Sequence, residues 1–321
     1  MKNQRILITG AFGFVGSNLT KNLIDEGATV ACLDIRDDFH LLPTVIQSKA
    51  TKYIGDISNM DYLRKVISDF EPNIIFHLAA QTLVEPALKD PLTTLESNIR
   101  GTWNLLETVR NSLPFVHAVV IASSDKAYGR AVTLPYTEAT ELIGRAPYDV
   151  SKSCTDLIST SYSQTYNIPL SIARCGNIFG AGDRNWSRII PSTFKSGFEG
   201  KNPQLRSDGT AIRDYIYIED VVSAYKSLAI ATTTNFFRGE AFNFSNNDPK
   251  SVLEICDLVL ESIGRTDLKP EILNRATHEI DAQHLDSTKA RKLLGWENKF
   301  EIRDALLLSA TWYKKEFVIE Q

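Results

Sequence analysis

The stretch ITGAFGFVGSNL, residues 8–19, decides the fold of this chain. It places Gly10, Gly13 and Gly16 in GxxGxxG spacing between an apolar run, RILIT at 5–9, and a segment with apolar residues at helical spacing. Glycines let a backbone turn tightly and approach a pyrophosphate, and a helix start supplies free N–H groups and partial positive charge. The stretch therefore predicts a dinucleotide-binding turn between a strand and a helix; a structural turn without a ligand is the alternative.

An acidic residue ends the second apolar run, TVACLD at 29–34. Asp34 lies 24 residues after Gly10, where a carboxylate can accept hydrogen bonds from a ribose diol. Because a carboxylate repels a 2′-phosphate, Asp34 favours NAD over NADP. The nearby Arg36 could attract such a phosphate and so favours NADP. Asp56, in GDIS after the third run, is predicted to lie near the adenine or to cap the helix that follows.

Apolar runs alternate with amphipathic segments through the first half of the chain. Predicted strands are ATKYIGD, PNIIFHLAA (72–80), VHAVVIASS and LSIARCG, and predicted helices are NMDYLRKVISDF, TTLESNIRGTWNLLETVRNS and YDVSKSCTDLISTSYSQTY. Near-continuous apolar strands separated by helices are typical of a parallel sheet covered on both faces. The fold class is therefore α/β, a doubly wound parallel sheet, followed by a smaller mixed α/β C-terminal domain. After residue 180 we expect ligand-facing loops and short elements, and then helices over VVSAYKSLAIA, SVLEICDLVLESI and IRDALLLSATWYKKEF.

Composition excludes several classes of partner. The 321 residues are 43% apolar and 23% charged with a net charge of −4, which is ordinary for a globular enzyme and gives no reason to expect nucleic acid or a membrane as partner. The cysteines lack CxxC spacing and are expected to be small buried hydrophobes, and no metal site is expected. We find no signal peptide and no long apolar run, so a cytoplasmic location is predicted.

Tyr148 and Lys152, in APYDVSKSC, are four residues apart and so share one face of a helix. A nearby ammonium and a positive nicotinamide would lower the pKa of the phenol, which could then accept a proton from a substrate hydroxyl while a hydride leaves the carbon. Ser124 would hydrogen-bond to the same hydroxyl; the alternative is that it merely ends a strand.

Together, GxxGxxG, Asp34, HLAA (77–80), SSDKAYG and YxxxK resemble the short-chain dehydrogenase/reductase superfamily. The segments ARCGNIFGAGD and RDYIYIEDV narrow the resemblance to its extended branch, the NAD-dependent epimerase/dehydratase family, over essentially the whole chain. The resemblance implies a Rossmann domain for NAD over 1–178 with a return segment near 214–245, and a nucleotide-sugar domain mainly over 179–321. It also implies a homodimer formed through helices around 93–111 and 148–167.

The resemblance also assigns ligand contacts. For NAD it implies Gly10, Gly13, Phe14, Val15, Gly16, Asp34, Ile35, Asp56, Ile57, Leu78, Ala79, Ala80, Asn98, Tyr148 and Lys152. For the substrate it implies Gln81, Asn177, Arg188 and Arg213. A guanidinium fork suits a diphosphate because it bonds two oxygens at once. The alternative for Arg213 is a surface ion pair with Asp214 or Asp220.

Asp125 and Lys126 follow Ser124 directly. Sugar epimerases of the family need only Ser/Thr, Tyr and Lys, whereas the 4,6-dehydratases carry Asp-Glu here, or Asp-Lys in the CDP-glucose type that this chain resembles most. The resemblance implies Asp125 as the acid at O6, Lys126 as the C5 base and Tyr148 as the C4 base. An ion pair between Asp125 and Lys126 would oppose both roles, so substrate must separate them or they must share protons as a coupled pair. A solvated turn is the alternative.

These observations predict a lyase, an NAD-dependent nucleotide-sugar 4,6-dehydratase. It oxidises C4 internally, eliminates water across C5 and C6 and returns the hydride to C6, giving a 4-keto-6-deoxy sugar. A nucleotide-sugar 4-epimerase, an isomerase of the same family, is the first alternative. A non-catalytic NAD-binding sensor is a remote one, because it has no need for Ser124, Tyr148 and Lys152 together.

Overall fold

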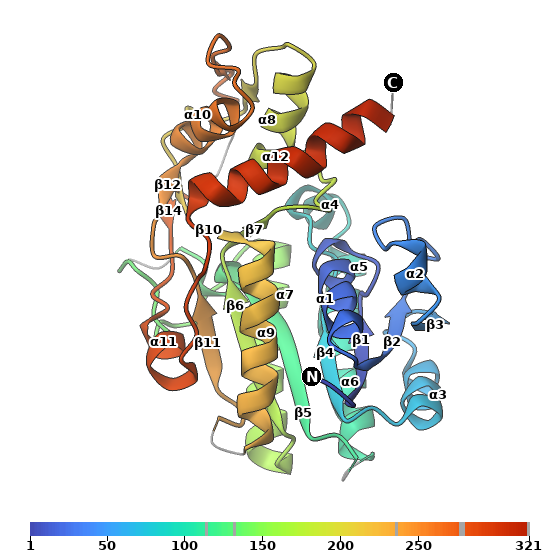
Figure 1. Ribbon diagram of the computed structural model, residues 1–321. Helices are drawn as coiled ribbons and strands as arrows, with labels where there is room; N and C mark the ends of the chain where they lie inside the picture. Colours follow the sequence, from blue (N-terminus) through green and yellow to red (C-terminus); the bar gives the residue numbers. More distant parts are fainter. Residues whose placement is uncertain (113–114, 131–132, 235–236, 276–279, 320–321) are drawn as a thin grey trace.

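A seven-stranded parallel sheet forms the centre of the computed structural model, which describes residues 1–112, 115–130, 133–234, 237–275 and 280–319 (Figure 1). The strand order is β11-β6-β5-β4-β1-β2-β3, so the order reverses between β1 and β4. The strands are β1 (Arg5–Thr9), β2 (Thr29–Asp34), β3 (Thr51–Ile54), β4 (Ile74–His77), β5 (Ala118–Ser124), β6 (Leu170–Cys175) and β11 (Ala241–Phe244). Ligands of open α/β sheets bind where the order reverses, outside the carboxyl ends of the strands.

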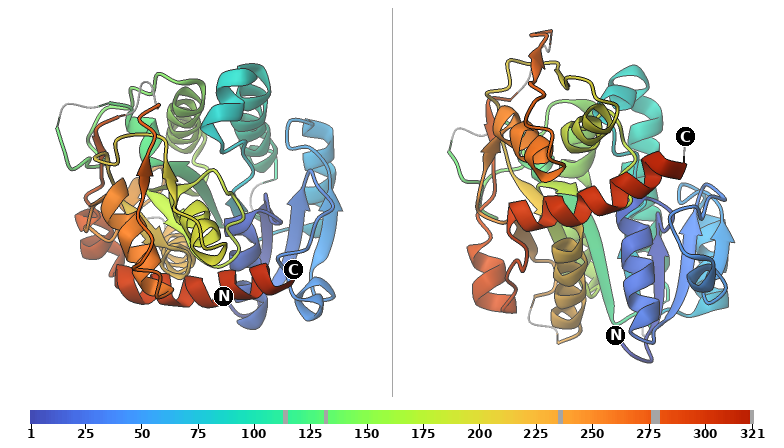
Figure 2. Two further views of the ribbon diagram at one scale, coloured as in Figure 1. Left: turned by 90° about the horizontal axis from the view of Figure 1, so that it is seen from above. Right: turned by 45° about the horizontal axis from the view of Figure 1, so that its top comes forward.

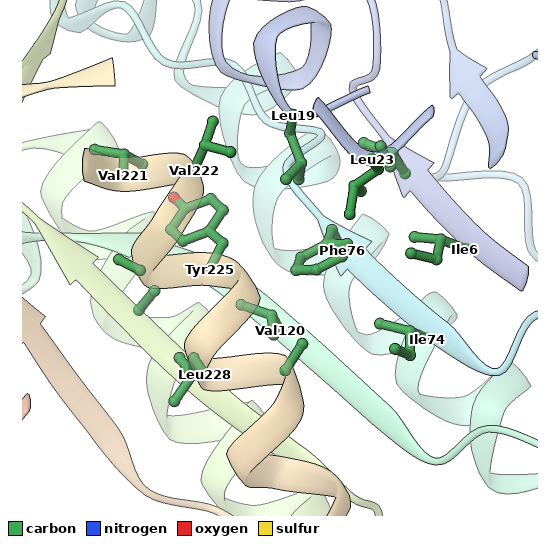
Figure 3. Close-up of a cluster of buried hydrophobic side chains, with 14 of the residues drawn as sticks. Ile6, Leu19, Leu23, Ile74, Phe76, Val120, Val221, Val222, Tyr225 and Leu228 are labelled. Atoms are coloured by element: carbon green, nitrogen blue, oxygen red, sulfur yellow. The ribbon is translucent and has the colours of Figure 1, made fainter. Parts of the chain in front are cut away.

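Helices cover both faces of this sheet. One face packs against α1 (Phe14–Asp25) and α9 (Ile218–Thr233), and the other against α3 (Met60–Phe70), α6 (Gly101–Arg110) and α7 (Pro147–Tyr166). Successive strand side chains point to opposite faces, so Ile6 and Ile8 join the first cluster and Leu7 the second. Figure 3 shows Tyr225 and Leu228 of α9 on the first face, opposite β4 and β5. The doubly wound α/β prediction is confirmed.

The predicted long helix after β4 contains an irregular turn. The short α4 (Val84–Lys89) comes first, and α5 (Pro91–Leu95) then continues through a π-helical turn, η1 (Glu96–Arg100), into α6. Single π-helical turns are frequent at functional sites because the extra residue re-aims nearby side chains. Here the turn carries Asn98, which is buried.

Smaller elements gather at the carboxyl ends of the strands, where α8, α10 and α12 lie above the sheet (Figures 1 and 2). The remaining helical pieces are α2 (Thr44–Gln47), η2 (Asp125–Tyr128), α8 (Ile189–Phe198), α10 (Val252–Ser262), α11 (Thr288–Leu294) and α12 (Ile302–Ile319). Of these, α11 packs beside β11 and not above the sheet. The short strands are β7 (Asn177–Phe179), β8 (Gln204–Leu205), β9 (Ile212–Arg213), β10 (Tyr215–Tyr217), β12 (Lys250–Ser251), β13 (Glu271–Ile272) and β14 (Ala282–Gln283). No helix in the described ranges is both long and apolar enough to cross a bilayer.

Loops and short elements were predicted after residue 180, and the helix α8 was not specified among them. Its sequence, IIPSTFKSGF, holds a proline and a glycine that disguise the helical period. Pro191 lies in the first turn, where a proline removes no intrahelical hydrogen bond, and Phe194 buries fully in the core shared with α10 and α12. The strand β11 lies in the predicted return segment near 214–245 and pairs with β6 in the central sheet. The predicted division into two domains at residue 178 stays a prediction.

Candidate active site

The glycine-rich turn between β1 and α1 lies against the loop that follows β4. A Cβ on Gly10, whose φ is +70°, would lie 2.8 Å from the Cα of Ala79. A Cβ on Gly16 would lie 2.1 Å from the carbonyl oxygen of Gly10. Both contacts are with backbone, so neither position tolerates a larger residue. Gly13 is the N-cap of α1, and Phe14 and Val15 form its first turn, whose N–H groups lack intrahelical acceptors. This close-packed cradle suits a dinucleotide.

Asp34 is fixed at the end of β2, beside that turn. It is buried, its Oδ2 accepts a hydrogen bond from the Phe12 N–H at 3.0 Å, and its Oδ1 accepts one from the Arg36 N–H at 3.1 Å. The Arg36 guanidinium Nε lies 3.9 Å from the same Oδ1 and is largely exposed. Arg36 therefore lies beside the carboxylate that was predicted to bind the ribose diol.

Three further predicted NAD contacts, of which Asp56 was expected near the adenine, follow the ends of β2 and β3. Ile35 and Asp56 are exposed, whereas Ile57 is buried. The Oδ1 of Asp56 accepts a hydrogen bond from the Ser58 N–H at 2.8 Å. The alternative role of Asp56 as a helix cap is wrong, because Asn59 is the N-cap of α3 and its side chain accepts from the Tyr62 N–H.

Asn98 joins three parts of the site. Its Oδ1 accepts from the Gln81 N–H at 2.7 Å, and its Nδ2 donates to the Gln81 carbonyl at 2.9 Å and to Ser151 Oγ at 2.8 Å. The loop after β4, with half-buried Leu78, Ala79, Ala80 and Gln81, is thereby tied to η1 and α7. Both ends of the Asn98 amide are engaged by the protein, so its predicted contact with NAD stays a prediction.

Ser124, Tyr148 and Lys152 come together between β5 and α7. Tyr148 and Lys152 are both more than nine-tenths buried, and Lys152 Nζ donates to the Ala122 carbonyl at 2.8 Å. Burial lowers the pKa of Lys152 to about 8. Burial raises the pKa of Tyr148, and the charge of Asp125 adds to that rise, while Arg188 and a hydrogen bond with Ser124 lower it. Among the protein groups alone, burial outweighs the contacts that lower the pKa of the phenol. The predicted lowering, which includes the positive nicotinamide, stays a prediction.

Asp125 and Lys126 begin the 3-10 helix η2, which starts where β5 ends. The Asp125 carboxylate is 2% exposed; its Oδ1 accepts from Ser124 Oγ at 2.9 Å, and its Oδ2 has no hydrogen-bond partner in the described ranges. Lys126 Nζ donates to Gln283 Oε1, on β14. Because the carboxylate is buried, the alternative of a solvated turn is wrong.

A buried ionic network behind these residues was not predicted from the sequence. Arg174 on β6 donates from Nε and Nη2 to Asp156 Oδ1 at 2.8 and 2.6 Å, and from Nη1 to the Tyr128 hydroxyl at 2.7 Å. Ser123 Oγ donates to the other oxygen of Asp156. The network joins α7, one turn beyond Lys152, to Ser123 on β5 and to Tyr128 at the end of η2. An arginine inside the apolar run LSIARCG was the one sequence signal for it, since buried charges are paired.

Three of the four predicted substrate contacts lie on β7, β9 and the N-cap of α8, and the fourth, Gln81, lies in the loop after β4. Asn177 Nδ2 donates to the Asp214 carbonyl at 3.2 Å, which holds Asn177 beside the residue that follows Arg213. Arg213 is 8% exposed, so its guanidinium is not at the surface as the alternative required. Arg188, the N-cap of α8, donates to Asp183 Oδ2 at 3.1 Å. Its positive charge acts to lower the pKa of Tyr148.

We expect Asp214→Asn to stabilise the fold more at pH 8 than at pH 5. Asp214 is fully buried, its Oδ1 has no hydrogen-bond partner in the described ranges, and burial raises its pKa to about 6. The folded state therefore holds this proton to higher pH than the unfolded chain, so the carboxyl lowers stability as the pH rises from about 4 to above 6. At pH 8 the asparagine should add about 2 kcal/mol to the free energy of unfolding in urea. The exposed Asp257→Asn is the control; an Asp214→Asn effect independent of pH would contradict the expectation.

Comparisons with known proteins agree with this geometry. A family model described as GDP-mannose 4,6 dehydratase matches residues 7–307. A CDP-glucose 4,6-dehydratase of Salmonella typhimurium is 31% identical, over 98% of this chain and 91% of that protein. A UDP-glucose 4-epimerase of Lactobacillus helveticus is 29% identical, over 97% of both.

Solved structures give the same answer. A UDP-glucose 4-epimerase of Thermotoga maritima superposes with a TM-score of 0.89 at 26% identity, covering 97% of this chain and 99% of that one. A dTDP-glucose 4,6-dehydratase of Bacillus anthracis, in complex with NAD, superposes with a TM-score of 0.85 at 27% identity, covering 98% and 97%. The resemblance read from the sequence is thus confirmed: the chain belongs to the GDP-mannose 4,6-dehydratase family, among the extended short-chain dehydrogenase/reductases with epimerase or dehydratase activity.

Proposed function

We propose that the protein is a nucleotide-sugar 4,6-dehydratase that uses NAD. The observation that carries the proposal is the buried Asp125 carboxylate, whose Oδ2 has no hydrogen-bond partner in the described ranges and which adjoins Ser124 and Tyr148. Burying a carboxyl oxygen without a partner is unfavourable, so such groups are concentrated at functional sites. A 4-epimerase has no step that needs an acid there, whereas a dehydratase must protonate a departing hydroxyl.

NAD is held in the cradle of Gly10, Gly13 and Gly16, with its adenosine ribose at Asp34. The relatives of known structure support this cofactor, since the dTDP-glucose 4,6-dehydratase of Bacillus anthracis was solved with NAD. The diphosphate of the substrate lies among Asn177, Arg188 and Arg213. All four cysteines are free thiols, which fits the predicted cytoplasmic location.

The first half of the reaction belongs to Tyr148. When bound, NAD would supply the redox chemistry, as hydride acceptor from C4 and hydride donor to C6. The phenol oxygen of Tyr148 takes the proton of the C4 hydroxyl, and Ser124 hydrogen-bonds to that hydroxyl and orients it. Lys152 lies one helical turn away, and burial lowers its pKa to about 8. Its ammonium form stabilises the phenolate of Tyr148 by its positive charge.

The elimination belongs to Asp125 and Lys126. Once C4 is a ketone, the C5 proton is acidic, and the Lys126 amine removes it. The electrons of the C5–H bond first pass to the C4 carbonyl as an enolate. They then form the C5–C6 double bond as the C6–O bond breaks. Asp125 gives its proton to the departing oxygen, which leaves as water. Addition of hydride to C6 and of a proton to C5 completes a 4-keto-6-deoxy sugar without net use of cofactor.

The decisive experiment is a product analysis. Purified protein is incubated separately with CDP-glucose, UDP-glucose, dTDP-glucose, GDP-mannose and UDP-N-acetylglucosamine, and the products are weighed by mass spectrometry. A product lighter by one water, formed without added reduced cofactor, supports the proposal and names the nucleotide. An unchanged mass with inverted C4 stereochemistry by NMR makes the protein an epimerase, and no product from any sugar favours a sensor.

A homodimer forms part of the proposal. Leu92 on α5, Trp103 on α6 and Leu157 on α7 are exposed, on the helices expected to pair with a second copy. Large apolar side chains gathered on neighbouring helices mark interaction surfaces. We expect Leu157→Asp to convert a dimer to a monomer in light scattering after gel filtration. Leu307 on α12 is a similarly exposed leucine, and Leu307→Asp, the control, should leave the dimer intact. If Leu157→Asp is a dimer as well, this assignment is contradicted.

A further inference from the structure

Gln283 makes two contacts with η2, the helical turn that carries Asp125 and Lys126. The two partners Gln283 and Lys126 are 157 residues apart in sequence, and the Gln283 side chain is fully buried. Its Oε1 accepts from Lys126 Nζ, and its Nε2 donates to the Gly129 carbonyl at 3.2 Å. Gly129, with φ at +61°, is the residue that ends η2. One buried amide therefore holds both the amine and the end of the turn.

The chemistry of this partner suits a lysine that acts as a base. Such a lysine must be neutral before it can accept a proton from carbon. A carboxylate partner would favour the ammonium form through its charge, whereas an amide oxygen orients the amine by a hydrogen bond and adds no net charge. Gln283 thus orients the Lys126 amine through a hydrogen bond that adds no charge of its own.

We infer that Gln283 is a positioning residue that aims Lys126 at C5 of the sugar, an inference that rests on the proposed dehydratase function. The sheet around it supports the placement. Gln283 on β14 is in register with Arg213 on β9, a proposed diphosphate contact. Binding of the diphosphate and the aim of the base are therefore fixed by neighbouring strands of one small sheet.

The first test measures the contact without turnover. Lys126 is acetylated with acetic anhydride, and its rate of modification is read from peptide mass spectra of wild type, Gln283→Glu and Gln283→Met. The glutamate forms an ion pair with Lys126, and a rise of one pKa unit slows labelling about tenfold. The methionine removes the acceptor, so the amine becomes more open to the reagent and labelling accelerates. Equal rates in all three proteins would overturn the inference.

The second test separates a role in aiming the base from general loosening. With the sugar that wild type dehydrates, Gln283→Glu should lower kcat about 100-fold and change KM less than about threefold, within the range for a lost general base. The isotope effect for substrate deuterated at C5 should rise, because removal of that proton becomes rate-limiting. Structural loosening would slow each step and leave the C5 isotope effect unchanged, and that result would overturn the inference.

Gln47→Met is the matched control. Gln47 on α2 also donates its side-chain amide to backbone carbonyls, those of Phe39 at 3.2 Å and Leu42 at 2.7 Å, and it lies outside the site. It should leave the labelling of Lys126, kcat and the C5 isotope effect at wild-type values. If wild type loses no water from any sugar, the proposed function fails and the assignment of a C5 base fails with it. If wild type releases water and Gln283→Glu does so equally fast, only the inference fails.

Discussion

Replacing Tyr148 with phenylalanine is expected to lower kcat/KM about 10³-fold on whichever nucleotide sugar the enzyme converts. Tyr148 is buried beside Ser124, and we propose its phenol oxygen as the group that takes the proton of the C4 hydroxyl. The variant keeps the ring and its packing, so the loss falls on the proton transfer rather than on the fold. The measurement is the initial rate of product formation by mass spectrometry, with thermal unfolding recorded in parallel.

Tyr162→Phe controls for loss of a hydroxyl on the same helix. Tyr162 lies on α7, and its hydroxyl donates to Glu107 Oε2 at 3.3 Å, away from Ser124. This variant should retain wild-type kcat/KM. If Tyr148→Phe retains activity within about tenfold, general-base catalysis by the phenol, which typically contributes 10²- to 10⁴-fold, is not operating at C4.

Asp125→Asn is expected to slow the loss of water about 10³-fold while removal of the C5 proton continues. An asparagine keeps the shape and the contact with Ser124 but has no proton to give to the departing oxygen. In deuterated water, substrate recovered from the variant should therefore carry deuterium at C5 without having lost water. Mass spectrometry of recovered substrate and product measures both steps in one reaction.

Asp220→Asn is a closely matched control. Asp220 on α9 is also fully buried, and its Oδ2 likewise has no hydrogen-bond partner in the described ranges, but its Oδ1 accepts from the Lys299 N–H, remote from η2. Its replacement should leave the rate of water loss unchanged. Should Asp125→Asn release water as fast as wild type, Asp125 is not the acid, and the epimerase alternative gains weight.

The glycine turn and the YxxxK pair were accessible from sequence because their residues are close in the chain and their spacing fixes their geometry. The turn needs glycine at Gly10 and Gly16, where any Cβ would meet backbone, and a spacing of four puts Tyr148 and Lys152 on one helical face. Residue spacing within one turn or one helix fixes the relative positions of the side chains, so the placement of these residues could be predicted. The central sheet could be predicted from the alternation of apolar runs and amphipathic segments.

Long-range partners were not accessible in the same way. Gln283 stands in a segment without periodicity, and nothing local indicates that it meets Lys126. Asp156 lies in the predicted helix YDVSKSCTDLISTSYSQTY, where nothing local indicates that it meets Arg174 of β6 and Ser123 of β5. The effect of burial on the pKa of Tyr148 was inaccessible for a related reason, because burial is a property of the whole fold.

The return of β11 to the central sheet has a consequence for biosynthesis. Until residue 244 has left the ribosome, β6 is an open edge with unpaired backbone groups and an apolar sequence. Such an edge pairs readily with other chains, which makes it a site of aggregation. Between the synthesis of β6 and that of β11, the nascent protein therefore has a nearly complete central sheet whose β6 edge can still pair with other chains. Chaperone occupancy during synthesis should peak in that interval, and a fragment ending at residue 178 should precipitate where the full chain stays in solution.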